Sequence, residues 1–267
     1  MLEIRDISFA YEKGKPMLKK VSMAFQRGEI TGILGANGSG KSTLMKVIMR
    51  LLLPQQGEIF YENRAVGKKK KSLLTYRQAV NLVFQNPEQQ LFFSLVRDDV
   101  AMALENLGFS DEEIARRVQG ALGRMGILEL ADAPIQYLSY GQKKRVAIAD
   151  VLALQPHYLL LDEPTAGLDP SGREKMLQTM KELASQGVGI ILSSHDMDLM
   201  YEACDYAYLL REGELISEGT KDVFFQQEEL LRTAGLESPW IVQMHQMIGT
   251  PLVSSRSDFI QFLQRRM

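Results

Sequence analysis

The first residues of the chain alternate between apolar and polar side chains. Leu2 to Phe9 carries apolar residues among charged neighbours, which predicts a strand with one irregularity. Lys13 to Pro16 has the composition of a turn, and Met17 to Phe25 has a second strand-like pattern. We therefore expect an antiparallel β part at the N-terminus.

Farther along, short apolar runs bounded by turn residues predict buried strands. Helical patterns lie between these runs, such as the apolar face formed by Met176, Leu177, Met180 and Leu183. Strands that alternate with helices predict an α/β fold with a parallel or mixed sheet. The predicted strands are 30–34, 57–61, 79–84, 158–161 and 188–192.

The segment from about Pro87 to Gln155 has a helical pattern of its own. Apolar residues recur at helical spacing over Val96 to Leu107, and Ser110 followed by Glu113 is typical of a capping box. We expect an α-helical subdomain at about 87–155, inserted in a domain that spans 1–220. Residues 221–267 are expected to form a short helical C-terminal extension, with an amphipathic helix over 257–267.

Composition excludes several classes of protein. A net charge of −2 lacks the basic footprint of a nucleic-acid-binding domain, so no nucleic-acid partner is expected. The chain has no apolar stretch of membrane-spanning length and no signal-peptide core at its N-terminus. Its single cysteine, Cys204, allows no internal disulfide and fits a reducing compartment. We expect a cytoplasmic protein that reaches a membrane only through a partner.

The residues Gly35 to Thr43 fit the phosphate-binding pattern G-x-x-x-x-G-K-[ST], between a predicted strand and a helix. Glycines let the loop N–H groups point at phosphate oxygens, and the start of the helix adds positive charge. Lys41 is expected to reach the β- and γ-phosphates, and Ser42 to hold Mg²⁺. The strand–loop–helix setting argues against a glycine-rich turn with a chance lysine. The predicted ATP-binding residues of this loop are Gly35, Asn37, Gly38, Ser39, Gly40, Lys41, Ser42 and Thr43.

Two acids follow the predicted strand 158–161. Asp162 and Glu163 therefore stand at a carboxyl end, where open α/β sheets bind ligands. Asp162 is expected to hold Mg²⁺ through water, and Glu163 to activate the attacking water. Either acid alone is typical of a solvated strand end, but with the phosphate loop they predict a nucleoside triphosphatase.

Between these motifs, Leu138-Ser139-Tyr140-Gly141-Gln142 resembles the Leu-Ser-Gly-Gly-Gln signature of the ATP-binding-cassette superfamily, although Tyr140 replaces the usual first glycine. The resemblance covers about residues 1–220, because further elements follow in the family's order. It implies that Ser139 caps a helix running to about Leu154. It also implies that Ser139, Gly141 and Gln142 contact ATP held by a second chain, so that two chains enclose two MgATP.

The same resemblance assigns roles to residues that are uninformative singly. Gln85 matches the Q-loop, with a role in catalysis and Mg²⁺ binding, and His195 matches the switch histidine, which helps to position the γ-phosphoryl. Tyr11 matches the aromatic residue that stacks on adenine. The segment 166–169, ending at Asp169, matches the nucleotide-contacting D-loop.

Longer segments resemble one branch of the superfamily, the energy-coupling-factor transporters and their cobalt-uptake members. These segments are 85–92, 138–149 and 162–170; Asp150 stands where a small residue is more usual. The branch implies the ATPase of an importer for cobalt, nickel or another micronutrient, at the cytoplasmic face of the membrane. Its partners are a second ATPase subunit, more readily a copy of the same chain than a different one, an integral-membrane coupling subunit and a substrate-binding membrane subunit.

Two further expectations concern partners. Arginines of a coupling subunit would suit the acidic and polar residues that follow Gln85, namely Glu88, Gln89, Gln90, Asp98 and Asp99. The alternative is that these acids only solvate a helix start, where negative charge is favoured. The alternative function is that of a soluble cassette ATPase, for example a cluster-assembly protein. Recovery from membranes with a transmembrane partner distinguishes the two.

Overall fold

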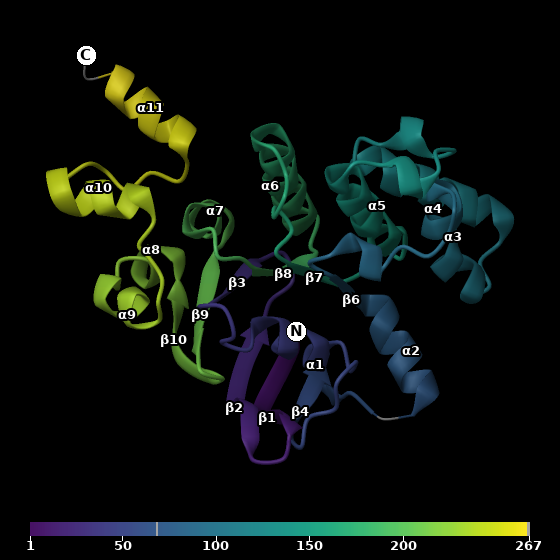
Figure 1. Ribbon diagram of the computed structural model, residues 1–267, viewed down its shortest axis with the longest axis horizontal. Helices are drawn as coiled ribbons and strands as arrows, with labels where there is room; N and C mark the ends of the chain where they lie inside the picture. Colours follow the sequence, from purple (N-terminus) through teal and green to yellow (C-terminus); the bar gives the residue numbers. More distant parts are fainter. Residues whose placement is uncertain (68, 266–267) are drawn as a thin grey trace.

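Two sheets of different character lie on either side of the helix that follows the phosphate loop (Figure 1). The computed structural model describes residues 1–67 and 69–265. The N-terminal sheet is antiparallel, as the alternating pattern predicts, and has the strand order β2-β1-β4-β5. Its strands are β1 (Leu2–Glu12), β2 (Lys15–Phe25), β4 (Gln56–Tyr61) and β5 (Arg64–Ala65).

The second sheet has the strand order β10-β9-β3-β8-β7-β6 and carries the candidate chemistry. Its neighbouring strands are parallel except for the antiparallel hairpin of β9 and β10, so the expected mixed sheet is confirmed. Continuous apolar runs form its central strands because both faces are covered. The strands are β3 (Ile30–Leu34), β6 (Val80–Val83), β7 (Tyr158–Asp162), β8 (Gly189–Ser193), β9 (Tyr206–Arg211) and β10 (Glu214–Thr220).

The helix α1 (Lys41–Ile48) shares a buried cluster with both sheets, through residues such as Leu44 and Val47. It ends earlier than the apolar spacing predicts. Arg50 has a left-handed backbone with φ 56°, and Leu51 is 47% exposed, so neither Leu51 nor Leu52 belongs to the helix. The remaining apolar positions are sufficient to hold α1 between the sheets.

The inserted segment is helical, as expected. It contains α3 (Val96–Asn106), α4 (Asp111–Arg124) and α5 (Tyr140–Ala153), with short 3₁₀ turns before α3 and between α4 and α5. Ser110 caps α4 by accepting the Glu113 N–H, but the Glu113 carboxylate pairs with Arg116 and Arg117. Only the serine half of the predicted capping box is therefore present.

Two other helices flank the sheet. α6 (Pro170–Ser185) buries the predicted apolar face, and α7 (Met197–Ala203) follows β8. Gly32 of β3 has no room for a side chain, since an added Cβ would lie 2.8 Å from the buried Cys204 Sγ. Neither α7 nor α2 (Lys70–Ala79) was predicted, and the lysine-rich start of α2 does not have an apolar helical pattern.

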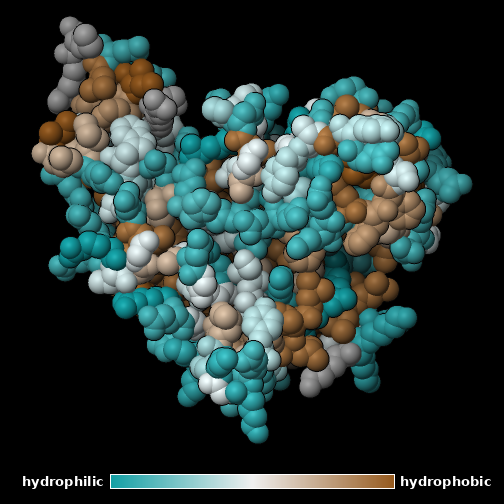
Figure 2. All heavy atoms as spheres, in the orientation of Figure 1, coloured by the Kyte–Doolittle hydropathy of each residue, from teal (hydrophilic) through white to brown (hydrophobic). Residues whose placement is uncertain are grey.

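The C-terminal extension packs against α7 and shares the core of the main domain. It consists of α8 (Lys221–Phe224), α9 (Glu228–Thr233), α10 (Trp240–Ile248) and α11 (Arg256–Gln264). The terminal helix is thus confirmed up to residue 264, and residues 266–267 lie outside the described part. Figure 2 shows apolar surface at the upper left, over α10 and α11. Met247 and Ile248 of α10 are exposed.

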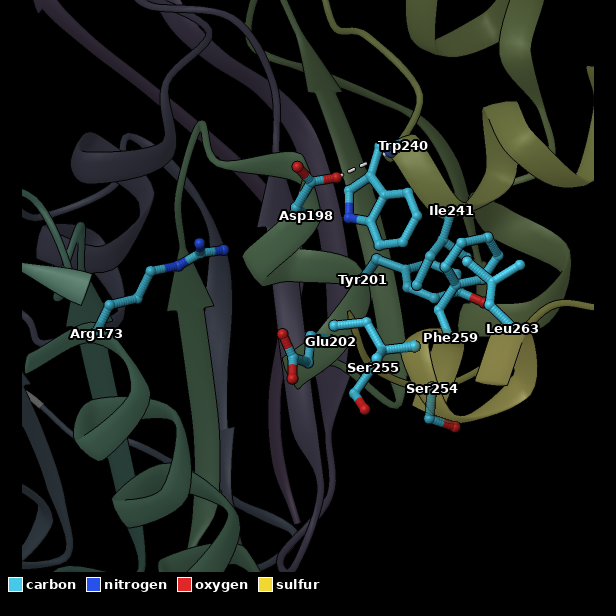
Figure 3. Close-up of a pocket in the computed structure, with 11 residues that line it drawn as sticks. Arg173, Asp198, Tyr201, Glu202, Trp240, Ile241, Ser254, Ser255, Phe259 and Leu263 are labelled. Carbon is cyan, nitrogen blue, oxygen red and sulfur yellow. Dashed lines mark hydrogen bonds between the residues drawn. The ribbon is translucent and has the colours of Figure 1, made fainter. Parts of the chain in front are cut away.

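A cavity of about 510 Å³ lies between the extension and α7 (Figure 3). Tyr201, Trp240 and Phe259 line it, and the main-chain N–H of Trp240 donates to the Asp198 carboxylate at 2.9 Å. The extension is therefore attached to α7, the helix that follows the candidate switch residue His195. In the described ranges, no helix has the length and apolar character needed to cross a membrane.

Candidate functional site

The phosphate loop joins β3 to α1 and depends on glycine at several positions. Gly38 and Gly40 have φ values of +81° and +109°, which favour glycine. A Cβ at Gly35 would lie 2.3 Å from the Leu210 carbonyl oxygen and 2.5 Å from Ser39 Oγ. The Ser39 hydroxyl is buried and has no hydrogen-bond partner within the described chain. A buried, unpaired hydroxyl beside a glycine cradle fits a phosphate oxygen.

Lys41 begins α1 and lies within this loop. Its side chain is buried, and Nζ donates to the carbonyls of Gly35 at 2.6 Å and Ala36 at 3.1 Å. Burial lowers the pKa of the Lys41 ammonium, and the charges of Glu163 and Asp162 act in the opposite direction. The predicted lysine and the predicted acids are therefore electrostatic neighbours.

The two acids lie at the carboxyl edge of β7, as the sequence predicts. β7 pairs with β8, with Asp162 opposite Ser193, so the residues that follow both strands converge. The Ser193 hydroxyl donates to the Asp162 carboxylate, and the Ser194 hydroxyl donates to Glu163 at 3.2 Å. His195 Nδ1 lies 2.9 Å from the other Glu163 oxygen, while the His195 ring is 69% exposed.

Ser193 and Ser194 are site residues that sequence reasoning missed. The available signal was their position directly before His195, at the end of a strand that neighbours β7. A hydroxyl beside each carboxylate fixes the orientation of both acids, because each hydroxyl donates one hydrogen bond. Glu163 is further defined by its left-handed backbone, with φ +49°.

Gln85 follows β6 and is exposed. Its carbonyl accepts a 3.0 Å bond from the Tyr140 hydroxyl and a 2.6 Å bond from Lys144 Nζ. The predicted roles of the Gln85 side chain in catalysis and Mg²⁺ binding stay predictions. The geometry nevertheless brings the Q-loop and the signature together within one chain.

The signature forms the start of α5. Ser139 Oγ accepts the Gln142 N–H at 3.3 Å, and the Ser139 N–H donates to the Gln142 side chain at 2.8 Å. This complete capping box confirms Ser139 as the helix cap. Ser139 is exposed, and a Cβ at Gly141 would lie 3.2 Å from Cδ2 of Leu168 in the D-loop. The contacts of Ser139, Gly141 and Gln142 with a second chain's ATP stay predictions.

Tyr11 and Asp169 lie at the margins of the site. The Tyr11 ring is 58% exposed, packs edge-on against Phe9 at 4.9 Å, and its hydroxyl lies 3.3 Å from Thr43 Oγ1. This is a suitable position for stacking on a base above the phosphate loop. Asp169 caps α6 by accepting the Gly172 N–H at 2.7 Å.

The expected acidic contact surface after Gln85 is wrong in part. Asp99 is 3% exposed, and its carboxylate accepts the N–H groups of Phe92 at 2.8 Å and Phe93 at 2.6 Å. Glu88 is exposed and pairs with Lys143 at 2.7 Å. Asp99 therefore holds the segment internally and is unavailable to a partner, since its negative charge is used by two main-chain donors.

Asp150 is explained by the same region. Its Oδ1 is buried and has no hydrogen-bond partner in the described chain. Burial raises the pKa of the Asp150 carboxyl well above its usual range, and the nearby Asp99 charge raises this pKa further. Both effects favour the neutral form of the Asp150 carboxyl.

The residues at this edge fit MgATP. The loop offers N–H groups, the Ser39 hydroxyl and the Lys41 ammonium to phosphates. Ser42 and Asp162 offer hydroxyl and carboxylate oxygens, which are ligands that Mg²⁺ prefers. Glu163 lies beside this group with its carboxylate held on both sides, so the arrangement can support hydrolysis of a phosphoanhydride.

Comparisons with known proteins agree with this geometry. Residues 18–166 match the family described as ABC transporter. The chain is 44% identical over 265 residues to the cobalt import ATP-binding protein CbiO of Salmonella typhimurium, covering 99% of this chain and 97% of that protein. It is 40% identical to the energy-coupling factor transporter ATP-binding protein EcfA of Methanocaldococcus jannaschii, covering 93% and 89%.

A solved structure has the same fold. The cbiO1 protein of Clostridium perfringens, described as part of the ABC transporter complex cbiONQ, superposes with a TM-score of 0.79 at 38% identity. The match covers 92% of this chain and 98% of that one. The expected core, N-terminal antiparallel sheet and helical subdomain are therefore those of a known architecture.

Proposed function

The chain belongs to the ABC transporter family, whose ATPases hydrolyse ATP to drive transport, and we propose that it is the ATPase subunit of an energy-coupling-factor importer for cobalt or a related transition-metal ion. The observation that carries the catalytic part is the Glu163 carboxylate, held by Ser194 and His195 beside the Lys41 loop. The importer branch and the cargo are supported by full-length similarity to CbiO and EcfA.

Glu163 acts as the general base in this proposal. Its carboxylate accepts the proton of the water that attacks the γ-phosphoryl group, a role worth about 10²–10⁴-fold in rate. Ser194 donates to one carboxylate oxygen and His195 contacts the other, so the base is oriented before the water arrives. His195 is exposed enough to reach the phosphoryl group as well.

Charge on the phosphates is stabilised by the phosphate loop. The Lys41 ammonium leaves the carbonyls of Gly35 and Ala36 and binds phosphate oxygens, with the loop N–H groups around it. Ser42 and Asp162 hold Mg²⁺, and Gln85 contributes from the Q-loop. When bound there, Mg²⁺ would offset the negative charge of the phosphates. Tyr11 stacks on the base.

The signature completes the ATP site of a second chain. Ser139 caps α5 and is exposed, so the first turn of this helix presents N–H groups and positive partial charge outward. Gly141 and Gln142 extend this surface, and Asp169 lies at its edge, all facing the second nucleotide. One chain carries every residue of this proposed composite site, which favours a homodimer.

The membrane coupling subunit contacts the segment after Gln85. A groove of about 360 Å³ lies here, lined by the exposed Phe92 and Phe93 and by the Glu88–Lys143 ion pair. Aromatic side chains beside a charged pair suit an amphipathic helix of a partner. Binding of the ion falls to a separate membrane subunit, and the ATPase remains peripheral at the cytoplasmic face.

Co-purification tests this proposal against a soluble cassette ATPase. The chain is tagged in its native host, and detergent-solubilised membranes and the soluble fraction are each examined for associated proteins. We expect integral-membrane partners and ATP-dependent uptake of radiolabelled cobalt that is lost with Glu163→Gln. Recovery only from the soluble fraction contradicts the importer. Uptake of nickel in preference to cobalt would support the importer function but contradict cobalt as the transported ion.

A further inference from the structure

One side of the first turns of α5 contacts the nucleotide-binding core. Tyr140 and Lys144 are four residues apart and therefore neighbours on the helix surface. The Tyr140 hydroxyl donates to the Gln85 carbonyl at 3.0 Å, and Lys144 Nζ donates to the same carbonyl at 2.6 Å. The Q-loop main chain thus carries two bonds to the signature helix.

Lys144 extends this link to the catalytic base. Its Nζ also donates to the main-chain carbonyl of Glu163 at 2.9 Å, and the residue is fully buried. Burial lowers the pKa of Lys144 to about 8, while the charges of Asp162 and Glu163 partly offset this effect. A buried ammonium is costly to leave unpaired, so its two carbonyl partners are held firmly.

Tyr140 adds a contact with the D-loop. Gly167 has a left-handed backbone with φ +77°, and a Cβ there would lie 2.8 Å from Cε1 of the Tyr140 ring. The ring therefore covers Gly167 closely, next to Leu168 and Asp169. The usual residue at the Tyr140 position of the signature is glycine, which has neither a ring nor a hydroxyl to make these contacts.

We propose that Tyr140 is a positioning residue that makes the signature of a chain follow the Q-loop of the same chain. Lys144 anchors the helix to Gln85 and Glu163, and Tyr140 carries a movement of the Gln85 main chain to the helix start. Ser139 and Gly141 then move with the chain's own nucleotide site. The inference rests on the proposed function, because it needs these two residues to serve the ATP of a second chain.

The chemical consequence is cooperativity between two ATP sites. ATP bound at one phosphate loop moves Gln85, and Tyr140 passes this movement to the signature that completes the other site. Tyr140→Phe removes only the hydroxyl that donates to Gln85 and keeps the ring on Gly167. The matched control is Tyr137→Phe, which removes the hydroxyl of a 79% exposed tyrosine in the same region.

The experiment measures steady-state ATP hydrolysis of the full-length chain against ATP concentration, together with binding of a fluorescent ATP analogue. We expect the Hill coefficient of Tyr140→Phe to fall from clearly above one to about one, and kcat to fall about 3–10-fold, the loss of one hydrogen bond of about 1 kcal/mol. Affinity for the analogue should stay within about twofold. Tyr137→Phe should resemble the wild type in every respect.

Hydrogen exchange supplies the second readout. Amides of the segment 85–90 should exchange several-fold faster in Tyr140→Phe, with no change in the phosphate loop. A wild-type Hill coefficient of one, or identical cooperativity and exchange in Tyr140→Phe, overturns the inference. A wild-type chain that fails to bind or hydrolyse ATP instead overturns the proposed function, so the two failures are distinguishable.

Discussion

His195 Nδ1 lies 2.9 Å from a carboxylate oxygen of Glu163, across the carboxyl ends of two adjacent parallel strands. The proposed switch histidine and the proposed base therefore share one contact. Ser194 donates to the other oxygen, so the carboxylate is held from both sides by residues of a single turn. Replacement of the proposed base Glu163 is therefore expected to stop hydrolysis without preventing nucleotide binding.

Glu163→Gln keeps the size and most hydrogen bonds of the side chain but removes its ability to accept a proton. We expect ATP binding to persist and turnover to fall about 10²–10⁴-fold. ATP hydrolysis and binding of labelled ATP are measured on the same preparation. Glu129→Gln, at an exposed surface position, is the control. Hydrolysis by the Glu163 variant at near the normal rate contradicts the assignment.

Mixed dimers test whether two chains share each site. Lys41→Ala removes the phosphate-loop ammonium and Ser139→Arg obstructs the exposed signature, so each variant alone is expected to be inactive. In a mixed dimer, one composite site carries both lesions and the other carries neither. Some activity should return after mixing and exchange of subunits, up to about a quarter of normal, because half of the dimers are mixed, each has one intact site, and coupling between the sites lowers the rate of a lone site. Mixed dimers that form but remain inactive would indicate self-contained sites.

Lys144 predicts a pH dependence of stability. Its pKa is lowered to about 8 by burial from 10.5. Between these values the unfolded chain binds more protons than the folded chain, so the free energy of unfolding rises with pH. Relative to Lys144→Met, the wild type should gain up to about 3 kcal/mol between about pH 7 and about pH 10.5. Urea unfolding of both proteins at both pH values checks this prediction. An equal change in the free energy of unfolding for the wild type and Lys144→Met would contradict it.

Phe92 and Asp99 are linked by a hydrogen bond but have different expected roles, one in partner binding and the other in stability. Phe92 is 73% exposed, so Phe92→Ser should leave the unfolding temperature nearly unchanged and weaken binding of the coupling subunit at least tenfold. Asp99 is buried and holds two N–H groups, so Asp99→Ala should destabilise the chain by about 1–3 kcal/mol. Thermal unfolding and co-purification are compared for both. Normal complex formation by a folded Phe92→Ser chain would contradict the proposal that the coupling subunit binds at this surface.

Local patterns predicted most of the fold and placed the phosphate loop and the acid pair, whereas the roles of Tyr11, Gln85 and His195 came from the family resemblance. Continuous apolar runs identified β3, β7 and β8 because a strand covered on both faces needs apolar residues at every position. The phosphate loop and the pair Asp162–Glu163 were recognisable because their spacing is contained in one short segment. The end of α1 and the start of α2 were not, since composition alone does not locate a left-handed residue such as Arg50 or a helix that begins with lysines.

Features that depend on contacts between distant segments were not predicted from the sequence. Asp99 looks solvated in sequence because it follows another acid at a helix start, but the chain folds back so that Phe92 and Phe93 donate to it. Lys144 looks like one of three consecutive surface cations, yet it alone is fully buried, because two carbonyls from other segments receive its ammonium. Such burial depends on the tertiary fold and has no local signal.

The burial of Cys204 has a practical consequence for measuring the proposed movement of the signature helix. Its thiol is 2% exposed, and burial together with the nearby Asp205 charge raises its pKa, so little reactive thiolate forms at neutral pH. Because it is the only cysteine in the chain, it should react slowly with maleimide reagents. Fluorophores attached through new cysteines at exposed positions, such as Gln136 in the helical subdomain, would then report on single sites without first removing the native thiol.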